Sequence, residues 1–187
     1  REERERPVLL WLDLTRSMFF GTRVCFKSVL AAKLAALLAW NSVQHGDRLG
    51  CLVFSEQQHV EFRPQRGKHA ALPFLQQLAA HSARKMGETM GDTSVGDHQP
   101  GLHALKRLRQ VTRPGSLLVL LSDFRFLNPH CRGQLVELAR HSDIVMIHTY
   151  DPLEQVLPPP GYYRITDGVS SVAVDTSNPE VRAKYQQ

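Results

Sequence analysis

The sequence predicts an α/β fold with three layers, in which a mostly parallel central sheet of Rossmann type has helices on both faces. Two observations support this. Short, continuous apolar runs such as PVLLWLD and SLLVLLS are typical of strands that are buried on both faces. Longer segments with a helical pattern separate these runs, as expected where parallel strands are joined by crossover helices. With 187 residues, of which 42% are hydrophobic, the chain can bury a core as a single domain spanning 1–187.

The first half of the chain alternates strand and helix. We expect a buried strand over 7–13 and a helix over 22–45 that is apolar nearly all round apart from Lys27 and Lys33, and so lies against the sheet with little exposure. A second buried strand over 48–55 and an edge strand over 59–63 follow. The next predicted element is an amphipathic helix over 68–82, with its inward positions at Leu72, Leu75 and Leu78.

The second half begins with an interruption. Residues 83–100 contain several glycines, no strand period and a closing proline, and are predicted to form a long surface loop. Helical and strand patterns then resume. The expected elements are a helix over 101–112, a strand over 116–122, a helix over 129–140, a strand over 143–150, two short strands over 162–166 and 171–174, and a helix from Asn178.

Composition narrows the class of protein. Lys and Arg number 23 against 18 Asp and Glu, but the two signs are interleaved, so nucleic-acid binding is not predicted. Three widely spaced cysteines form no disulfide or zinc pattern, which favours a reducing, cytoplasmic location. The longest apolar stretch, residues 29–40, is shorter than the ~20 residues of a membrane span. The chain lacks an initiator Met and is expected to be a fragment of a longer protein.

The motifs of common enzymes with this fold are absent from the sequence. It contains no GxGxxG for a dinucleotide, no GxxxxGK[ST] for nucleotide phosphates, no GxSxG for a serine hydrolase and no HExxH for zinc. A phosphatase of the DxDxT type would need a carboxylate where this chain has Thr15.

Oxygen-bearing side chains gather where two of the predicted strands end. Asp13, Thr15 and Ser17 follow the first strand at alternate positions, and Asp123 follows the strand over 116–122. Ligands of α/β proteins bind beyond the carboxyl ends of parallel strands. Hard oxygen donors of low total charge suit Mg²⁺ or Mn²⁺. The alternative is a capping cluster in which the same side chains satisfy free backbone N–H groups.

This pattern resembles the DxSxS signature of von Willebrand factor A domains, with Thr15 in place of the first serine. The chain more widely resembles the bacterial family known as domain of unknown function 58. The matching stretches are RPVLLWLDLTRSMFFGTRVCFKSVLAAKLAALLAW, GDRLGCLVF, RPGSLLVLLSDF and HTYDPLEQVLPPPGYYRITDG. The resemblance implies a von Willebrand factor A-like domain with a metal-ion-dependent adhesion site, which a threonine from a second loop and Asp123 from a third would complete.

The second-loop threonine is where the sequence departs from that pattern. Alignment of Leu102, Ala104 and Leu105 on the family's pattern puts Pro100 at the threonine position. Thr93 could substitute if its loop folds back, and Thr89 is a poorer candidate. A degenerate site with weakly bound Mg²⁺ or Mn²⁺ is therefore expected.

The resemblance implies a non-enzymatic protein-interaction module that helps a MoxR-type AAA+ ATPase act on client proteins. The open position on the metal would accept a carboxylate from the partner. Two alternatives remain: a metal-assisted hydrolase that uses Asp13 and Asp123, and a structural scaffold whose site is inactive.

Overall fold

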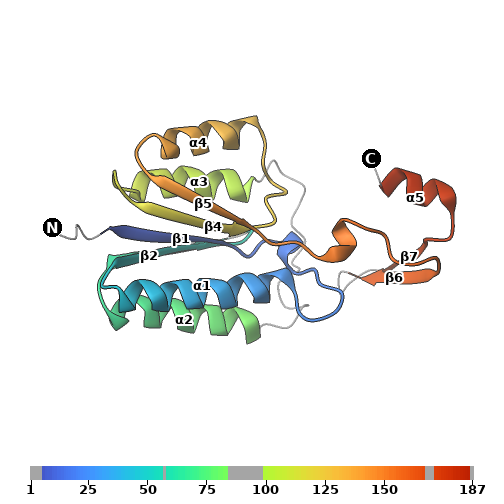
Figure 1. The fold of residues 1–187 in the computed structure, drawn as a ribbon, viewed down its shortest axis with the longest axis horizontal. Helices are drawn as coiled ribbons and strands as arrows, with labels where there is room; N and C mark the ends of the chain where they lie inside the picture. Colours follow the sequence, from blue (N-terminus) through green and yellow to red (C-terminus); the bar gives the residue numbers. More distant parts are fainter. Residues whose placement is uncertain (1–5, 57, 84–98, 167–170, 186–187) are drawn as a thin grey trace.

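The computed structural model describes residues 6–56, 58–83, 99–166 and 171–185. A five-stranded sheet with the order β3-β2-β1-β4-β5 forms the centre, and only β3 runs antiparallel to its neighbour (Figure 1). The predicted three-layer fold is thereby confirmed. The strands are β1 (Pro7–Asp13), β2 (Arg48–Phe54), β3 (His59–Gln65), β4 (Leu117–Ser122) and β5 (Asp143–His148).

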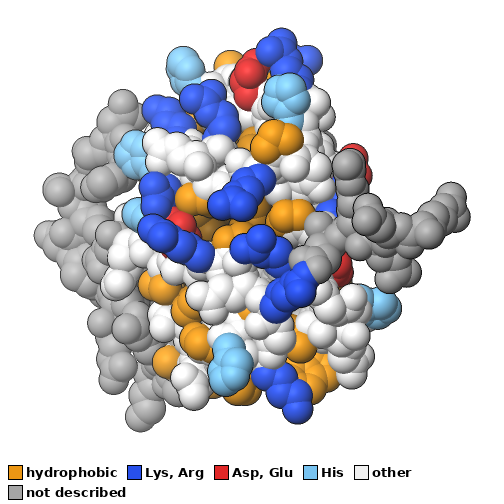
Figure 2. Space-filling view, turned by 90° about the vertical axis from the view of Figure 1, so that its left-hand side faces the viewer, with side chains coloured by type: hydrophobic (Ala, Val, Ile, Leu, Met, Phe, Trp, Pro, Cys, Tyr) orange, Lys and Arg blue, Asp and Glu red, His pale blue; other side chains and the backbone are white. Residues whose placement is uncertain are grey.

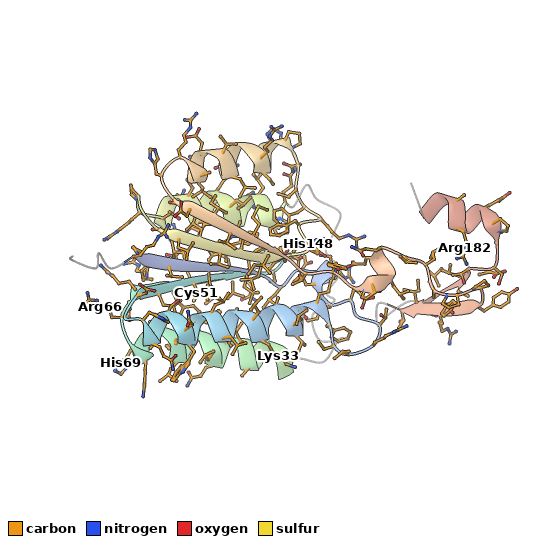
Figure 3. The ribbon with its side chains drawn as sticks, viewed as in Figure 1. Lys33, Cys51, Arg66, His69, His148 and Arg182 are labelled. Atoms are coloured by element: carbon orange, nitrogen blue, oxygen red, sulfur yellow. The ribbon has the colours of Figure 1, made fainter. Side chains whose placement is uncertain are left out.

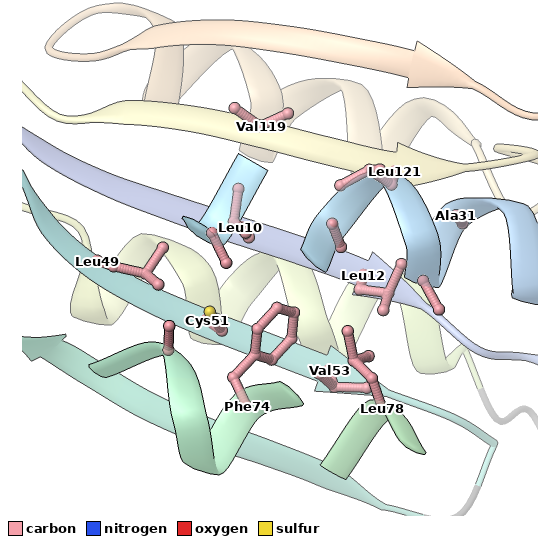
Figure 4. Packing of buried hydrophobic residues seen from close by; sticks show 14 of the residues in the cluster. Leu10, Leu12, Ala31, Leu49, Cys51, Val53, Phe74, Leu78, Val119 and Leu121 are labelled. Atoms are coloured by element: carbon pink, nitrogen blue, oxygen red, sulfur yellow. The ribbon is translucent and has the colours of Figure 1, made fainter. Parts of the chain in front are cut away.

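Two helices cover each face of the sheet (Figure 1). On one face lie α1 (Lys27–Gln44) and α2 (Lys68–Ala83), and on the other lie α3 (Pro100–Val111) and α4 (Pro129–Ala139). Each central strand divides its side chains between the two layers. In β1, Leu10 and Leu12 pack toward α1 and α2 (Figure 4), whereas Leu9 and Trp11 pack toward α3 and α4. This division explains why the strand sequence is apolar without alternation.

Helix α1 differs from the prediction in its start and in its exposure. It begins at Lys27 rather than at residue 22, because the backbone N–H and hydroxyl of Thr22 donate to the carboxylate of Asp151 instead of joining a helix. Its buried face consists largely of alanines, which allow close approach to the sheet. Several large side chains, Leu30, Leu37 and Trp40, point outward, and Leu37 is 69% exposed, so the expectation of little solvent exposure was wrong.

Helix α2 was predicted with nearly correct bounds but with a partly wrong inward face. Phe74 and Leu78 are buried as part of the core, Leu75 packs partly against it, and Leu72 is exposed. Of the loop predicted over 83–100, Ala83 ends α2 and Pro100 begins α3, while residues 84–98 lie outside the described residues.

The tail forms a separate unit beside the sheet (Figure 1). After the 3₁₀ helix η2 (Pro152–Glu154), β6 (Tyr162–Thr166) and β7 (Ser171–Asp175) pair as an antiparallel hairpin, and α5 (Pro179–Tyr185) follows. Within the described part of the chain, β5 has no partner strand along its outer edge. No described helix combines the length and the hydrophobicity that crossing a bilayer requires.

Positive charge gathers at the amino ends of the parallel strands (Figure 2). Arg6, Arg48, Arg113 and Arg140 each precede or begin one of these strands. Arg66, which follows the antiparallel β3, lies at the same end (Figure 3). This basic face is opposite to the carboxyl ends, where the candidate site lies.

We expect Gly101→Ala to destabilise the fold, although alanine is the better helix former. A Cβ at position 101 of α3 would lie 2.2 Å from Cδ2 of Phe126, which packs against Trp11 in the core. Overpacking of this kind costs about 1–3 kcal/mol, more than the ~0.5–1 kcal/mol that alanine gains over glycine in a helix. Gly133→Ala in α4 is the matched control, because its Cβ would meet nothing within 4 Å. Denaturant unfolding should show a lower midpoint for Gly101→Ala and an equal or higher one for Gly133→Ala; an unchanged midpoint for Gly101→Ala would contradict the packing argument.

Candidate functional site

The site starts where β1 and β4 end side by side. Asp13 lies on the same face of β1 as Trp11, and Ser122 lies on the same face of β4 as Leu120, so their side chains meet. The hydroxyl of Ser122 donates to Oδ2 of Asp13, and the backbone N–H of Thr15 donates to Oδ1 at 2.8 Å. The carboxyl group of Asp13 is 0% exposed. Both of its oxygens are thus engaged inside the protein.

Burial dominates the protonation of Asp13. It raises the pKa of this carboxyl from 3.8 to about 6, although the hydrogen bonds from Ser122 and Thr15 act in the opposite direction. The negative charge of Asp123 contributes a further, smaller rise. A carboxyl group with this pKa exchanges its proton near neutral pH, and a nearby cation would favour its charged form.

The two hydroxyls of the DxSxS-like motif connect the two carboxyl groups, because that of Thr15 hydrogen-bonds Asp13 and that of Ser17 hydrogen-bonds Asp123. Oγ1 of Thr15 lies 3.4 Å from Oγ of Ser17, and Ser17 in turn hydrogen-bonds the Asp123 carboxylate. Thr15 is the N-cap residue of η1 (Arg16–Met18), but its side chain makes no capping hydrogen bond. The capping alternative therefore does not account for these hydroxyls. Asp13, Thr15, Ser17 and Asp123 form one continuous group of oxygens.

Asp123 is held by its own loop and by a lysine. Its Oδ1 accepts from the backbone N–H of Arg125 at 3.2 Å, and its Oδ2 accepts from Nζ of Lys27 at 2.8 Å. Burial opposes ionisation, but the hydrogen bonds from Lys27 and Ser17 outweigh it and lower the pKa of Asp123 below its ordinary value. Phe124, with φ of 54°, turns the chain directly after this carboxylate.

Sequence reasoning missed two members of the site, Lys27 and Glu154. Lys27 is only 3% exposed, and its Nζ also donates to Oε1 of Glu154 at 2.6 Å. The available signal was a lysine at the start of a largely apolar helix, since such a charge is buried only when it is paired. Glu154 lies in the DPLE segment, which is part of a stretch that resembled the family, but nothing in its spacing predicted contact with α1.

The donor chemistry fits a hard divalent cation, with fewer ligands than a complete site. Two carboxylates and two hydroxyls are grouped, and this is the oxygen set that Mg²⁺ and Mn²⁺ prefer. Pro100 is the first residue of α3 and offers no hydroxyl, while Thr93 and Thr89 lie outside the described residues. Among the described residues no cluster of three His, Cys, Asp or Glu side chains is arranged to hold a metal.

Exposed residues surround this buried group. Arg16 follows Thr15, Arg125 follows Asp123 by two positions, and both are exposed. The loop between η1 and α1 presents Arg23 and Val24, and Val24 is 94% exposed. The carboxyl edge of the sheet thus combines a buried acidic centre with a basic, partly apolar rim.

Comparison with known proteins identifies relatives for the whole chain. The family model described as "Protein of unknown function DUF58" matches residues 1–187. Uncharacterized proteins of Mycobacterium bovis and Mycobacterium tuberculosis are 28% identical over 185 residues, which cover 98% of this chain and 55% of each relative. The chain therefore spans about half the length of these relatives.

Solved structures share the fold at low identity. An aerotolerance-related membrane protein of Bacteroides fragilis aligns with a TM-score of 0.57 at 13% identity, over 97% of this chain and 88% of the other. The conserved hypothetical protein BatB of Bacteroides thetaiotaomicron gives 0.55 at 12%, over 97% and 84%. The manganese-loaded TRAP protein of Plasmodium vivax gives 0.50 at 13%, over 78% and 57%. These similarities support a von Willebrand factor A-like fold.

The raised pKa of Asp13 predicts a specific dependence of stability on pH. The folded state binds this proton more tightly than the unfolded chain, so stability falls as pH rises from about 4 to about 6 and changes no further above that. The shift corresponds to about 3 kcal/mol. Asp13→Asn should remove this dependence, because the amide can accept from Thr15 and donate to Ser122. Urea unfolding in EDTA at several pH values should show that the free energy of unfolding of the wild type falls relative to that of Asp13→Asn as the pH rises to about 6. The same pH dependence in both proteins would contradict the prediction.

Proposed function

The chain belongs to the DUF58 family of proteins of unknown function, and from the geometry of its sheet edge we propose that this von Willebrand factor A-like domain is a non-enzymatic protein-interaction module. The observation that carries the proposal is the contrast between the centre and the rim of the site. Asp13 is fully buried with both oxygens bonded, whereas Arg16, Arg23, Val24 and Arg125 are exposed around it. An exposed basic and apolar rim suits contact with another protein.

The same contrast disfavours the hydrolase alternative. A general base must come within hydrogen-bond reach of the substrate proton. Asp13 has no exposed surface, and Asp123 is paired with Lys27. Incubation with generic phosphodiester and ester substrates, with and without Mn²⁺, tests this alternative directly; turnover that Asp123→Asn abolishes would favour the enzyme.

The proposed module includes a weakly bound Mg²⁺ or Mn²⁺. Asp13, Thr15, Ser17 and Asp123 would hold the ion, and the ion would supply an electrophilic centre for a carboxylate of the partner. In support, the contacts of the site connect three acidic groups, Asp13, Asp123 and Glu154. Two cations accompany them among the described residues: Lys27 bonds Asp123 and Glu154, and Nη1 of Arg125 lies 3.9 Å from Oε1 of Glu154. The carboxylates outnumber these cations, so a divalent ion would offset the remaining negative charge when all three acids are ionised.

The proposed partner is a MoxR-type AAA+ ATPase or one of its client proteins, presenting an acidic segment. The family resemblance supports the class of partner, and the arginines of the rim support the charge of the segment. Because the relatives extend well beyond this domain, the partner is proposed for the whole protein.

Titration with Mn²⁺, followed by calorimetry or by paramagnetic broadening, should give a dissociation constant in the high micromolar to millimolar range. Weak sites with few protein ligands reach about 10⁻³ M. Ser17→Ala should weaken binding several-fold, because it removes one hydroxyl ligand while leaving the buried Asp13 in place. Sub-micromolar binding would mean that a further group, such as Thr93, completes the shell. Equal binding by wild type and Ser17→Ala would locate the ion elsewhere.

Capture of the cognate MoxR-type ATPase by the full-length protein tests whether this ATPase is a partner and whether it binds at the carboxyl edge of the sheet. Arg125→Glu should reduce the captured amount several-fold at low salt, since it reverses a charge on the rim beside Asp123. Arg132→Glu, which reverses the charge of another exposed arginine, on α4, is the control and should capture as well as the wild type. Equal capture by both variants would exclude this edge of the sheet as the contact surface.

A further inference from the structure

Lys27 is surrounded by acidic side chains in the interior of the site. Its Nζ lies 2.8 Å from Oδ2 of Asp123 and 2.6 Å from Oε1 of Glu154, and its charge also acts on Asp151. The lysine side chain is 3% exposed, and that of Asp123 is equally buried. An ammonium group withdrawn from water to this extent needs such partners, because its desolvation is costly.

Glu154 is aimed at Lys27 by the fold of its own segment. Its Oε2 accepts from the backbone N–H of Asp151 at 2.9 Å, which leaves Oε1 to face Lys27 at 2.6 Å, with Nη1 of the exposed Arg125 farther away at 3.9 Å. Asp151 caps the same turn by accepting from the N–H of Leu153 at 2.9 Å. It also accepts from the hydroxyl of Thr22 at 2.8 Å. The segment 151–154 is therefore tied both to the loop before α1 and to the first residue of α1.

Three parts of the chain meet at this one ammonium group: the start of α1, the end of β4 and the segment 151–154. Holding loops together by bridging their carboxylates is what a structural divalent cation does in other proteins. Here a side chain of the protein does it. The positive charge also opposes the entry of any metal ion that would approach Asp123.

We propose that Lys27 is the resident cation of this site: its ammonium group pairs with both Asp123 and Glu154, keeps the loops assembled without metal, and lowers the affinity of the site for divalent ions. The inference deepens the proposed function by explaining why metal binding would be weak. It does not depend on the identity of the partner, or on detectable metal binding by the wild type.

Lys27→Gln tests the proposal, because glutamine keeps much of the length of lysine and removes its charge. In EDTA the variant should melt at a lower temperature than the wild type. Mn²⁺ should bind to it at least about tenfold more tightly than to the wild type, since a positive charge beside two carboxylates has been removed. Added Mn²⁺ should also restore most of the lost melting temperature. Mn²⁺ affinity that is no higher in Lys27→Gln than in the wild type would overturn the proposal.

Matched variants separate charge from packing. Lys33→Gln removes an exposed charge from the same helix (Figure 3) and should leave both melting temperature and Mn²⁺ affinity unchanged. Lys27→Arg keeps the charge and should not gain Mn²⁺ affinity. Addition of Glu154→Gln to Lys27→Gln should cancel much of the gain, because it removes one of the two carboxylates that the ion would bridge. A gain that persists undiminished in this double variant would contradict the bridging role.

The outcome remains decisive if Lys27→Gln does not fold in EDTA. The proposal then requires that Mn²⁺ restores folding, as measured by far-ultraviolet circular dichroism, and a variant that stays unfolded in Mn²⁺ overturns it. Failure of the proposed weak metal site looks different: the wild type would bind no Mn²⁺, while Lys27→Gln would still acquire binding.

Discussion

The burial of β1 on both faces is the constraint on which the rest of the structure depends. A strand with Leu10 and Leu12 on one side and Leu9 and Trp11 on the other needs a layer of helices on each side and a strand at each edge. Parallel neighbours then bring the ends of β1 and β4 together. The polar residues at the ends of these two strands therefore lie close together, and Asp13 and Ser122 hydrogen-bond inside the protein.

This placement brings two acidic side chains into one site, and residues of the same chain determine which of them is ionised. The burial of Asp13 favours its protonated form, whereas Lys27 and Ser17 stabilise Asp123 as an anion. Two carboxyl groups of the same type thus have opposite pKa shifts within one site. Burial raises the pKa of Asp13 more than its hydrogen bonds lower it, whereas at Asp123 the hydrogen bonds from Lys27 and Ser17 outweigh burial.

The layer order and nearly all elements could be predicted because they follow from local pattern. Apolar runs in the sequence predicted β1, β2 and β4, and turn residues indicated where these strands end. The same reasoning failed for the face of α1, because a helix rich in alanine packs closely through its small residues and leaves Leu30, Leu37 and Trp40 exposed. The hydrophobic pattern of the sequence shows that a helix is apolar, but it does not show which apolar side of the helix packs against the sheet.

The candidate site was predictable in part for a related reason. Asp13, Thr15, Ser17 and Asp123 follow strands, so topology alone brings them to one edge. Lys27 and Glu154 come from a helix start and from a turn in the tail, and their meeting depends on three-dimensional packing over long separations in the sequence. The hydrophobic periodicity of the sequence does not indicate a contact of this kind.

Those separations have a consequence for synthesis of the chain. Lys27 is 96 residues from Asp123 and 127 residues from Glu154. On the ribosome, α1 and the strands beside it are made long before the segment that supplies the last carboxylate. Contacts between residues so far apart form late, because closing long loops is entropically costly and their later partners are made last. The surface around Asp123 is therefore finished only after the whole sheet has been translated, and a nascent chain that ends before residue 154 lacks it.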